Sequence, residues 1–169
     1  MKYNFDNFVD RKGTHAIKLD AMPKGAAPDA LPVWIADMDF ACAPPIIEAL
    51  HTRVDREIFG YSLYDNDALK DAITGWFQRR YDWAVNKDDV FFSPGIVPAI
   101  AFLLQMLSDE GDGIIIQRPV YYPFTDKIKA SNRVIFNNAL LYNNGEYTMD
   151  YEDLEAHFAN PKVKGMVLC

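Results

Sequence analysis

Residues 89–98 read DVFFSPGIVP, and their order predicts a short buried strand, a tight turn at residues 93–95 and then a helix. A helix N-terminus carries backbone N–H groups without intrahelical acceptors, and Gly95 would allow a ligand to approach them closely. Such a turn can bind an anion. The pattern also fits an ordinary strand-to-helix turn, because the three glycines of the dinucleotide-binding fingerprint are absent. The helix should have one wide apolar face, formed by Ile96, Val97, Ile100, Ala101, Leu103, Leu104 and Leu107.

A second candidate is the carboxylate pair Asp37 and Asp39, at the end of a short apolar strand predicted over residues 33–40. Two acids two positions apart in a strand share one face, which would suit metal binding or acid–base chemistry. A pair that merely faces solvent is the alternative, because no third ligand is in view. The three histidines are scattered without metal-ligand spacing, so no metal site is predicted.

The composition narrows the possible classes of protein. Half of the 169 residues are apolar, which is enough for one domain with a real core. A net charge of −7 argues against nucleic acid or an anionic membrane as the main partner. No apolar run reaches the roughly 18 residues of a membrane helix, and no secretion signal is evident at the N-terminus. With only two cysteines, in no paired spacing, a reducing cytoplasm is the expected location.

The order of elements predicts an α/β fold. Residues 1–32 are interrupted by glycine and proline and should wrap over other parts of the protein. Helices are expected from Pro44 and after a cap at Asp65 or Asn66. From residue 90 onward, apolar strands at residues 114–117, 133–136 and 163–169 alternate with helices, which indicates a mainly parallel sheet covered on both faces. The turns at residues 93–97 and 118–124 should lie at the carboxyl edge of that sheet, where ligands bind.

Several motifs together resemble the N-terminal signature of the MalY/PatB-type C–S lyases. These motifs are VDRKGT at residues 9–14, KLD at 18–20, PVWIADMDF at 32–40, FGYS at 59–62, FSPGIVP at 92–98 and RPVYYPF at 118–124. They occur in the family's order and cover essentially the whole chain, and residues 34–40 are the most specific. Leu19 departs from the family, which usually has Trp there, and we expect this to affect packing only.

The resemblance implies the aspartate-aminotransferase fold of pyridoxal-phosphate (PLP) enzymes, a three-layer αβα sandwich that is incomplete in this chain. It implies an N-terminal arm and small-domain segment at residues 1–45 and part of the large cofactor domain at residues 46–169. The cofactor is pyridoxal 5'-phosphate. By the resemblance, the backbone of Gly95, Ile96 and Val97 would bind its phosphate.

The remaining roles also follow from the resemblance. Tyr121 would stack on the pyridine ring, although a core tyrosine is the alternative, and Tyr61 would reach the phosphate of a neighbouring subunit in a homodimer with shared active sites. Ala36 and Asp37 would line the substrate side. The family's Schiff-base lysine, the Asp for the pyridine nitrogen and the Arg for the substrate carboxylate match nothing here. Because the sequence also ends in an apolar run of strand character, we expect a longer natural protein and an inactive isolated chain.

The implied activity is cleavage of L-cystathionine or related cysteine S-conjugates to a thiol, pyruvate and ammonia. A class I/II aminotransferase is the chemical alternative, since both reactions share the phosphate and ring contacts. A non-catalytic chain that only binds a second chain is the alternative from another class, motivated by the missing lysine motif.

Overall fold

The computed structural model describes residues 4–169, which separate into two compact units. The first unit ends at Ser62 and the second begins at Leu63. The division at residues 45 and 46 expected from the sequence stays a prediction about the whole protein.

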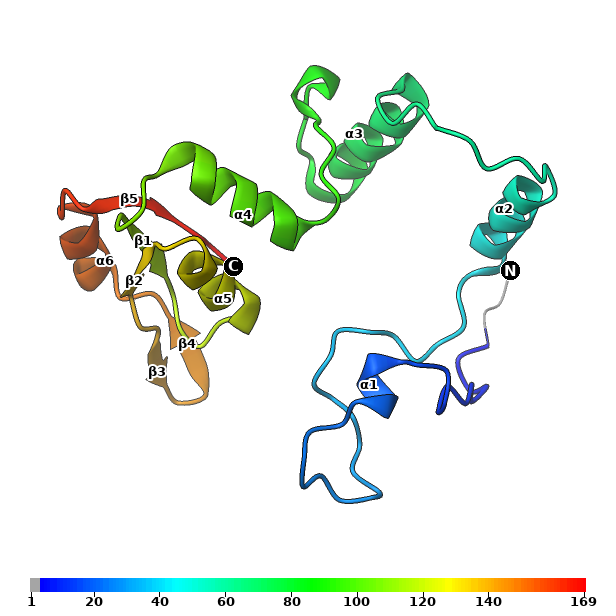
Figure 1. Ribbon diagram of the computed structural model, residues 1–169, viewed down its shortest axis with the longest axis horizontal. Coiled ribbons are helices and arrows are strands. Elements are labelled where there is room, and N and C mark those ends of the chain that lie inside the picture. Colours follow the sequence, from blue (N-terminus) through cyan, green and yellow to red (C-terminus); the bar gives the residue numbers. More distant parts are fainter. Residues whose placement is uncertain (1–3) are drawn as a thin grey trace. The chain divides into compact units, whose positions relative to one another are not determined.

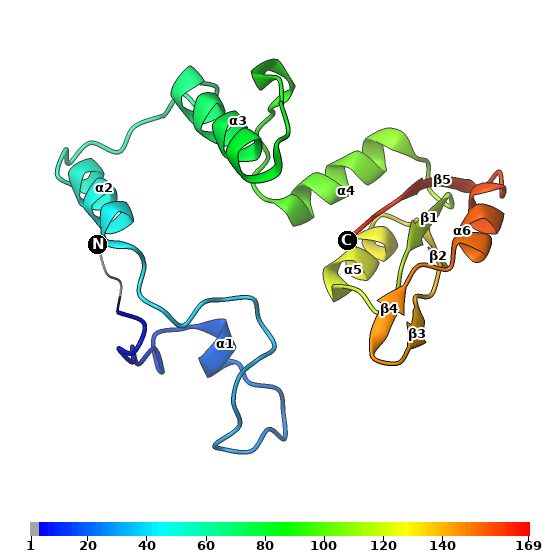
Figure 2. The same ribbon diagram turned by 180° about the vertical axis from the view of Figure 1, so that it is seen from behind.

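The second unit contains a three-stranded parallel sheet in the order β2-β1-β5 (Figure 1). The central strand β1, Gly113–Ile116, pairs with β2, Val134–Asn137, and with β5, Val163–Met166. The chain moves from β1 to β2 through helix α5, Tyr122–Ala130, and returns across β1 to β5 through helix α6, Tyr151–Phe158. Because crossovers between parallel strands are right-handed, two crossovers in opposite directions place their helices on opposite faces. Figures 1 and 2 both show the sheet between α6 and the pair formed by α5 and α4, Ile96–Leu107.

The predicted αβα layering is therefore confirmed, in partial form. The core lies between β1 and the two helices α4 and α5, and consists of Leu104, Ile114, Ile116, Phe124 and Ile128. All four residues of β1 are buried, as expected for a central parallel strand covered on both faces. On the other face the ring of Phe136 packs edge-to-face against His157 of α6, with centroids 5.6 Å apart.

Local signals in the sequence set several element boundaries. Asn66 caps helix α3, Asp67–Tyr81, by accepting a hydrogen bond from Leu69 N–H at 3.0 Å. Asp150 caps α6 in the same way through Asp153 N–H at 3.1 Å. The predicted turn near residue 144 joins an antiparallel hairpin whose strands were not predicted, β3, Leu141–Asn143, and β4, Glu146–Thr148. Asn144 and Gly145 both have positive φ, as a two-residue hairpin turn requires.

The first unit has little regular structure. It holds a four-residue helix α1, Ile17–Asp20, and helix α2, Pro44–Val54, which starts at the predicted proline pair. The polar, glycine- and proline-rich composition of residues 4–32 accounts for this, since it cannot sustain a long helix. Within the described residues, no helix has the length and apolar character needed to cross a membrane.

Two predicted strands are wrong. Residues 33–40 form bends and extended segments without a ladder, and residues 89–92 contain the end of a 3-10 helix, Lys87–Asp89, followed by irregular chain. Phe91 and Phe92 are 86% and 68% exposed, so this stretch is not buried either. The reason is the same in both places: a strand needs a hydrogen-bonded neighbour, and neither stretch has one among residues 4–169. Strand 163–169 is shorter than predicted and ends at Met166.

Candidate functional site

The first turn of α4 is open, which here means that no side chain among residues 4–169 accepts hydrogen bonds from its backbone N–H groups. Gly95 is the N-cap residue, with φ 136° and ψ 161°, a conformation that is essentially restricted to glycine. The first helical hydrogen bond is donated by Ala99 N–H to the Gly95 carbonyl at 3.0 Å, so the N–H groups of Ile96 and Val97 precede the ladder. Pro98 has no N–H to lose at this position.

No side chain of the described residues caps α4. The Ser93 hydroxyl, two residues before the N-cap, donates to the Gly95 carbonyl at 3.1 Å. The side chain of Ile96 is 76% exposed. The backbone donors of this turn are therefore directed to an accessible position, and the helix dipole adds positive potential there.

Tyr121 lies at the start of the next helix. It is the N-cap residue of α5, and β1 ends at Ile116, so a short connection brings it to the carboxyl edge of the sheet. Its ring is 54% exposed and meets Phe124 edge-to-face, with centroids 5.7 Å apart. Since Phe124 belongs to the core, this contact helps to fix the Tyr121 ring while the residue remains accessible.

Helix α5, which Tyr121 precedes, lines a cavity together with the first turn of α4. Helices α4 and α5 pack together, and Ile96 and Phe124 line one apolar cavity of about 380 Å³. The cavity also reaches Val167 and Leu168, which follow the carboxyl end of β5. The two predicted turns of this unit thus lie at the carboxyl edge of the sheet, where ligands bind in folds of this class.

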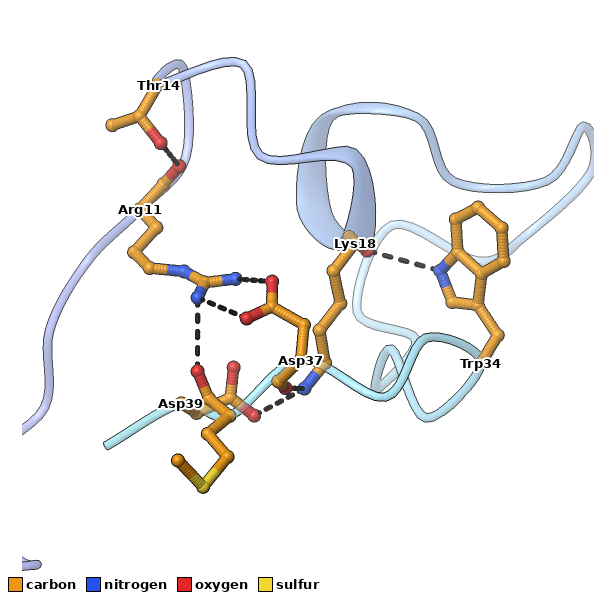
Figure 3. A network of polar contacts seen from close by, with 7 residues as sticks. Arg11, Thr14, Lys18, Trp34, Asp37 and Asp39 are labelled. Atoms are coloured by element: carbon orange, nitrogen blue, oxygen red, sulfur yellow. Dashed lines mark hydrogen bonds and ion pairs between the residues drawn. The ribbon is translucent and has the colours of Figure 1, made fainter. Parts of the chain in front are cut away.

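The other three predicted site residues belong to the first unit. Tyr61 is fully exposed near the end of this unit, after α2. Ala36 is exposed, and Asp37 is half-buried in the irregular segment 33–40. Figure 3 shows that Asp37 takes part in a set of polar contacts between this segment and residues 11–18. We call Arg11, Lys18, Asp37 and Asp39 the N-terminal polar network.

The N-terminal polar network joins two segments through paired charges. Arg11 donates to both carboxylate oxygens of Asp37, Nη1 to Oδ1 at 3.0 Å and Nη2 to Oδ2 at 2.6 Å. Lys18 Nζ donates to the Asp37 carbonyl and to Asp39 Oδ2, each at 2.7 Å. Both predicted carboxylates are therefore engaged as acceptors, and among the residues described here no group of three or more possible metal ligands occurs.

This pairing fixes the protonation of Asp37. The hydrogen bond from Arg11, followed by the positive charges of Arg11 and Lys18, holds the pKa of the Asp37 carboxyl below its usual value. The same hydrogen bond raises the pKa of Arg11. A carboxylate with a lowered pKa is a weak base near neutral pH, so the geometry favours an orienting role for Asp37 over proton transfer.

Sequence reasoning did not single out Arg11 or Lys18. Both lie in motifs that carried the resemblance, VDRKGT and KLD, but neither received a role. The signal that could have found them is the presence of basic residues in these motifs alongside two carboxylates, Asp37 and Asp39, that had no assigned partner. Lys18 is 6% exposed, and a lysine is almost never this buried unless it is paired.

Comparison with known proteins shows what the chain resembles. Residues 35–169 match the family model described as aminotransferase class I and II. The chain belongs to this family. It is 42% identical over 98% of its length to cystathionine beta-lyase PatB of Bacillus subtilis, and 35% identical over 99% to the protein MalY of Escherichia coli.

A solved structure supports the same family and fold. The chain matches cystalysin of Treponema denticola, a structure that contains pyridoxal 5'-phosphate, with a TM-score of 0.90 and 31% identity over 98% of this chain. The resemblance to the MalY/PatB proteins and the aspartate-aminotransferase-like fold predicted from the sequence are thereby confirmed. The chain spans 43% of the length of PatB, of MalY and of the cystalysin chain.

Proposed function

We propose that the whole protein is a pyridoxal-phosphate-dependent carbon–sulfur β-lyase. Its substrate would be L-cystathionine or a related cysteine S-conjugate, cleaved with one water to a thiol, pyruvate and ammonia. The observation that carries the proposal is the uncapped first turn of α4, in a chain similar to PatB along almost its whole length.

The residues at the first turn of α4 fit the phosphate of this cofactor. The N–H groups of Ile96 and Val97 lie ahead of the helical ladder. A Cβ at position 95 would be strained by the backbone angle, with φ at +136°, so glycine keeps the turn close to its ligand. A dianionic phosphate accepts hydrogen bonds from such donors and interacts favourably with the helix dipole.

Tyr121 would hold the plane of the cofactor ring. Its own ring meets Phe124 edge-to-face, lies 5.5 Å from the ring of Tyr122 between centroids, and belongs to a residue that is 54% exposed. Offset stacking adds about 0.5–1.5 kcal/mol beyond the burial of area. When bound, pyridoxal phosphate supplies an electron sink for the carbanion that forms on the amino-acid Cα. The described residues would bind and orient, with Ala36 and Asp37 on the substrate side.

An aminotransferase is the second candidate, because the matching family model carries that description and both reactions need the same phosphate and ring contacts. Likeness to PatB favours the lyase.

The test is an assay of the whole protein with L-cystathionine and added cofactor, measuring thiol and pyruvate together. We expect equimolar thiol and pyruvate without any added ketoacid. A sample without cofactor and the exposed-site variant Lys24→Gln are the controls, and the variant should match the wild type. Ketoacid-dependent amino transfer without thiol release would reject the lyase and favour the aminotransferase.

We further propose that the whole protein is a homodimer in which Tyr61 contacts the cofactor phosphate of the neighbouring subunit. The full exposure of Tyr61 in its own unit supports this, since such an aromatic ring is available to a partner. Mixing Tyr61→Ala subunits with Tyr121→Ala subunits tests it. Shared sites would raise activity above that of either variant alone, whereas independent sites would give only the average.

The expected location is the cytoplasm, as cysteine usage predicts. Activity in the soluble fraction of lysed cells, and its absence from a periplasmic or secreted fraction, is the result that agrees.

A further inference from the structure

The conformation of residues 33–40 is held mainly by side-chain contacts and not by backbone pairing. Among the described residues no strand pairs with this segment, and its one local backbone bond runs from Asp37 N–H to the Ile35 carbonyl at 2.8 Å. The segment would therefore be free to change shape if the side-chain contacts were lost, since a two-residue backbone bond alone constrains little.

The contacts that hold it converge on three consecutive residues. Arg11 binds both carboxylate oxygens of Asp37, and its Nη1 also donates to the Met38 carbonyl at 3.1 Å. Lys18 binds the Asp37 carbonyl and the Asp39 carboxylate. Figure 3 shows the two basic side chains reaching the segment from different points of residues 11–18. Side chain and backbone of Asp37 are thus held together, which fixes the peptide that follows Ala36.

The two basic residues are themselves held. Trp34 Nε1 donates to the Lys18 carbonyl at 3.2 Å, and the Thr14 hydroxyl donates to the Arg11 carbonyl at 2.6 Å. The Lys18 side chain is 7% exposed. The planar fork of Arg11 matches a carboxylate in two places at once, which a lysine at position 11 could not reproduce.

We propose that Arg11 and Lys18 are positioning residues, which hold Ala36 and Asp37 in the conformation that receives the amino-acid substrate. The inference rests on the proposed function for the identity of the substrate side. Neither residue is expected to touch the substrate or to move a proton. Their loss should weaken amino-acid binding and leave cofactor binding unchanged, because the cofactor contacts proposed above, at the first turn of α4, Tyr121 and Tyr61, lie outside residues 33–40.

The experiment uses the whole protein with four variants: Arg11→Gln, Arg11→Lys, which keeps the charge but not the fork, Asp37→Asn, and the double variant Arg11→Gln/Asp37→Asn. Lys24→Gln is the matched control, since it removes one exposed positive charge from the same unit. Three quantities are measured: amide hydrogen exchange of residues 33–40, cofactor affinity, and affinity for L-alanine, an amino acid without a leaving group at Cβ.

Arg11→Gln should speed exchange of residues 33–40 by about tenfold, because exchange there needs only local opening. It should weaken L-alanine binding by about 10- to 100-fold, as a displaced positioning residue does. The exchange rate and the L-alanine affinity of Arg11→Lys should lie between those of Arg11→Gln and those of the wild type. In the double variant, Asp37→Asn should add little to the effect of Arg11→Gln on hydrogen exchange and on L-alanine affinity, because the two residues act through one contact.

Several results would overturn the proposal. Unchanged exchange would show that the contacts do not hold the segment, and faster exchange with unchanged L-alanine affinity would show a purely structural role. Global unfolding of both Arg11 variants would assign the residue to the fold instead. Failure of the lyase assignment is separate: the wild type would release no thiol from cystathionine, while L-alanine affinity would still report on Arg11.

Discussion

Replacing Gly95 with alanine tests whether the first turn of α4 binds the cofactor phosphate. At φ 136° and ψ 161° an alanine is strained by about 1–3 kcal/mol. The added Cβ would lie 3.5 Å from Pro98 Cδ, an ordinary contact, so the cost comes from the backbone and not from a clash. The turn can relieve this strain by rotating, which moves the N–H groups of Ile96 and Val97.

If this strain energy is lost in full from the free energy of cofactor binding, the affinity falls by about 5- to 150-fold, since 1.4 kcal/mol corresponds to a factor of ten. The assay is a titration of the apoprotein of the whole enzyme with pyridoxal 5'-phosphate, followed by absorbance. Gly111→Ala is the matched control. Gly111 also has positive φ, at +88°, and no heavy atom lies within 4 Å of the position that an added Cβ would take, but this glycine precedes β1 at the other end of the strand.

Gly111→Ala should lower the thermal midpoint and leave cofactor affinity unchanged. The reasoning is refuted if Gly95→Ala binds the cofactor within about twofold of the wild type, because a factor of two is well below 1 kcal/mol. It is equally refuted if both variants weaken binding to the same extent, which would indicate a general loss of stability.

Three further predictions concern other parts of the chain. Tyr121→Ala should weaken cofactor binding by about 2- to 12-fold through lost stacking, and Tyr121→Phe should not; equal losses in the same titration would contradict a stacking role. Ile115→Ala, in the fully buried centre of β1, should lower the free energy of unfolding by about 2–5 kcal/mol in urea, and a loss below 1 kcal/mol would contradict its place in the core. Because the pKa of Asp37 is lowered in the folded state, its contribution to stability is present above the unfolded value of 3.8 and is lost as pH falls through the folded pKa. The thermal midpoint of Asp37→Asn should therefore fall less steeply than that of the wild type below pH 3.8, and parallel curves would argue against the Arg11 contact.

The elements that could be predicted from sequence are those with local signals. Helix α4 follows from its apolar period, α3 and α6 from their capping residues, and β1 from a run of buried isoleucines between glycines and polar residues. The parallel order of the sheet follows from the alternation of strands and helices. Each of these inferences needs only residues within one element or its immediate neighbours.

The predictions that were wrong concern segments whose structure depends on partners distant in the sequence. Residues 33–40 and 89–92 have strand composition, but composition cannot say whether a neighbouring strand is available. The β3–β4 hairpin was missed for the opposite reason, because its strands are only three residues each and are exposed. For the site, the turn before α4 and Tyr121 stay predictions from local pattern and resemblance, whereas Arg11 and Lys18 pair with acids 26 and 21 positions away, which local pattern does not reveal.

The partners of Asp37 and Asp39, which only the structure reveals, change the chemistry that can be assigned to this carboxylate pair. Spacing alone left Asp37 and Asp39 open to metal binding, acid–base work or exposure to solvent. In the structure, each accepts from a basic side chain. Arg11 lowers the pKa of Asp37, and a carboxylate held in its charged form orients better than it exchanges protons. Three lysines likewise form ion pairs, Lys18 with Asp39, Lys70 with Asp65 and Lys87 with Asp67. Pairing raises the pKa of Lys70 and of Lys87. A lysine that removes a proton must instead be neutral near pH 7, which requires a lowered pKa. Lys70 and Lys87, whose pKa values are raised, are therefore unsuited to this proton transfer.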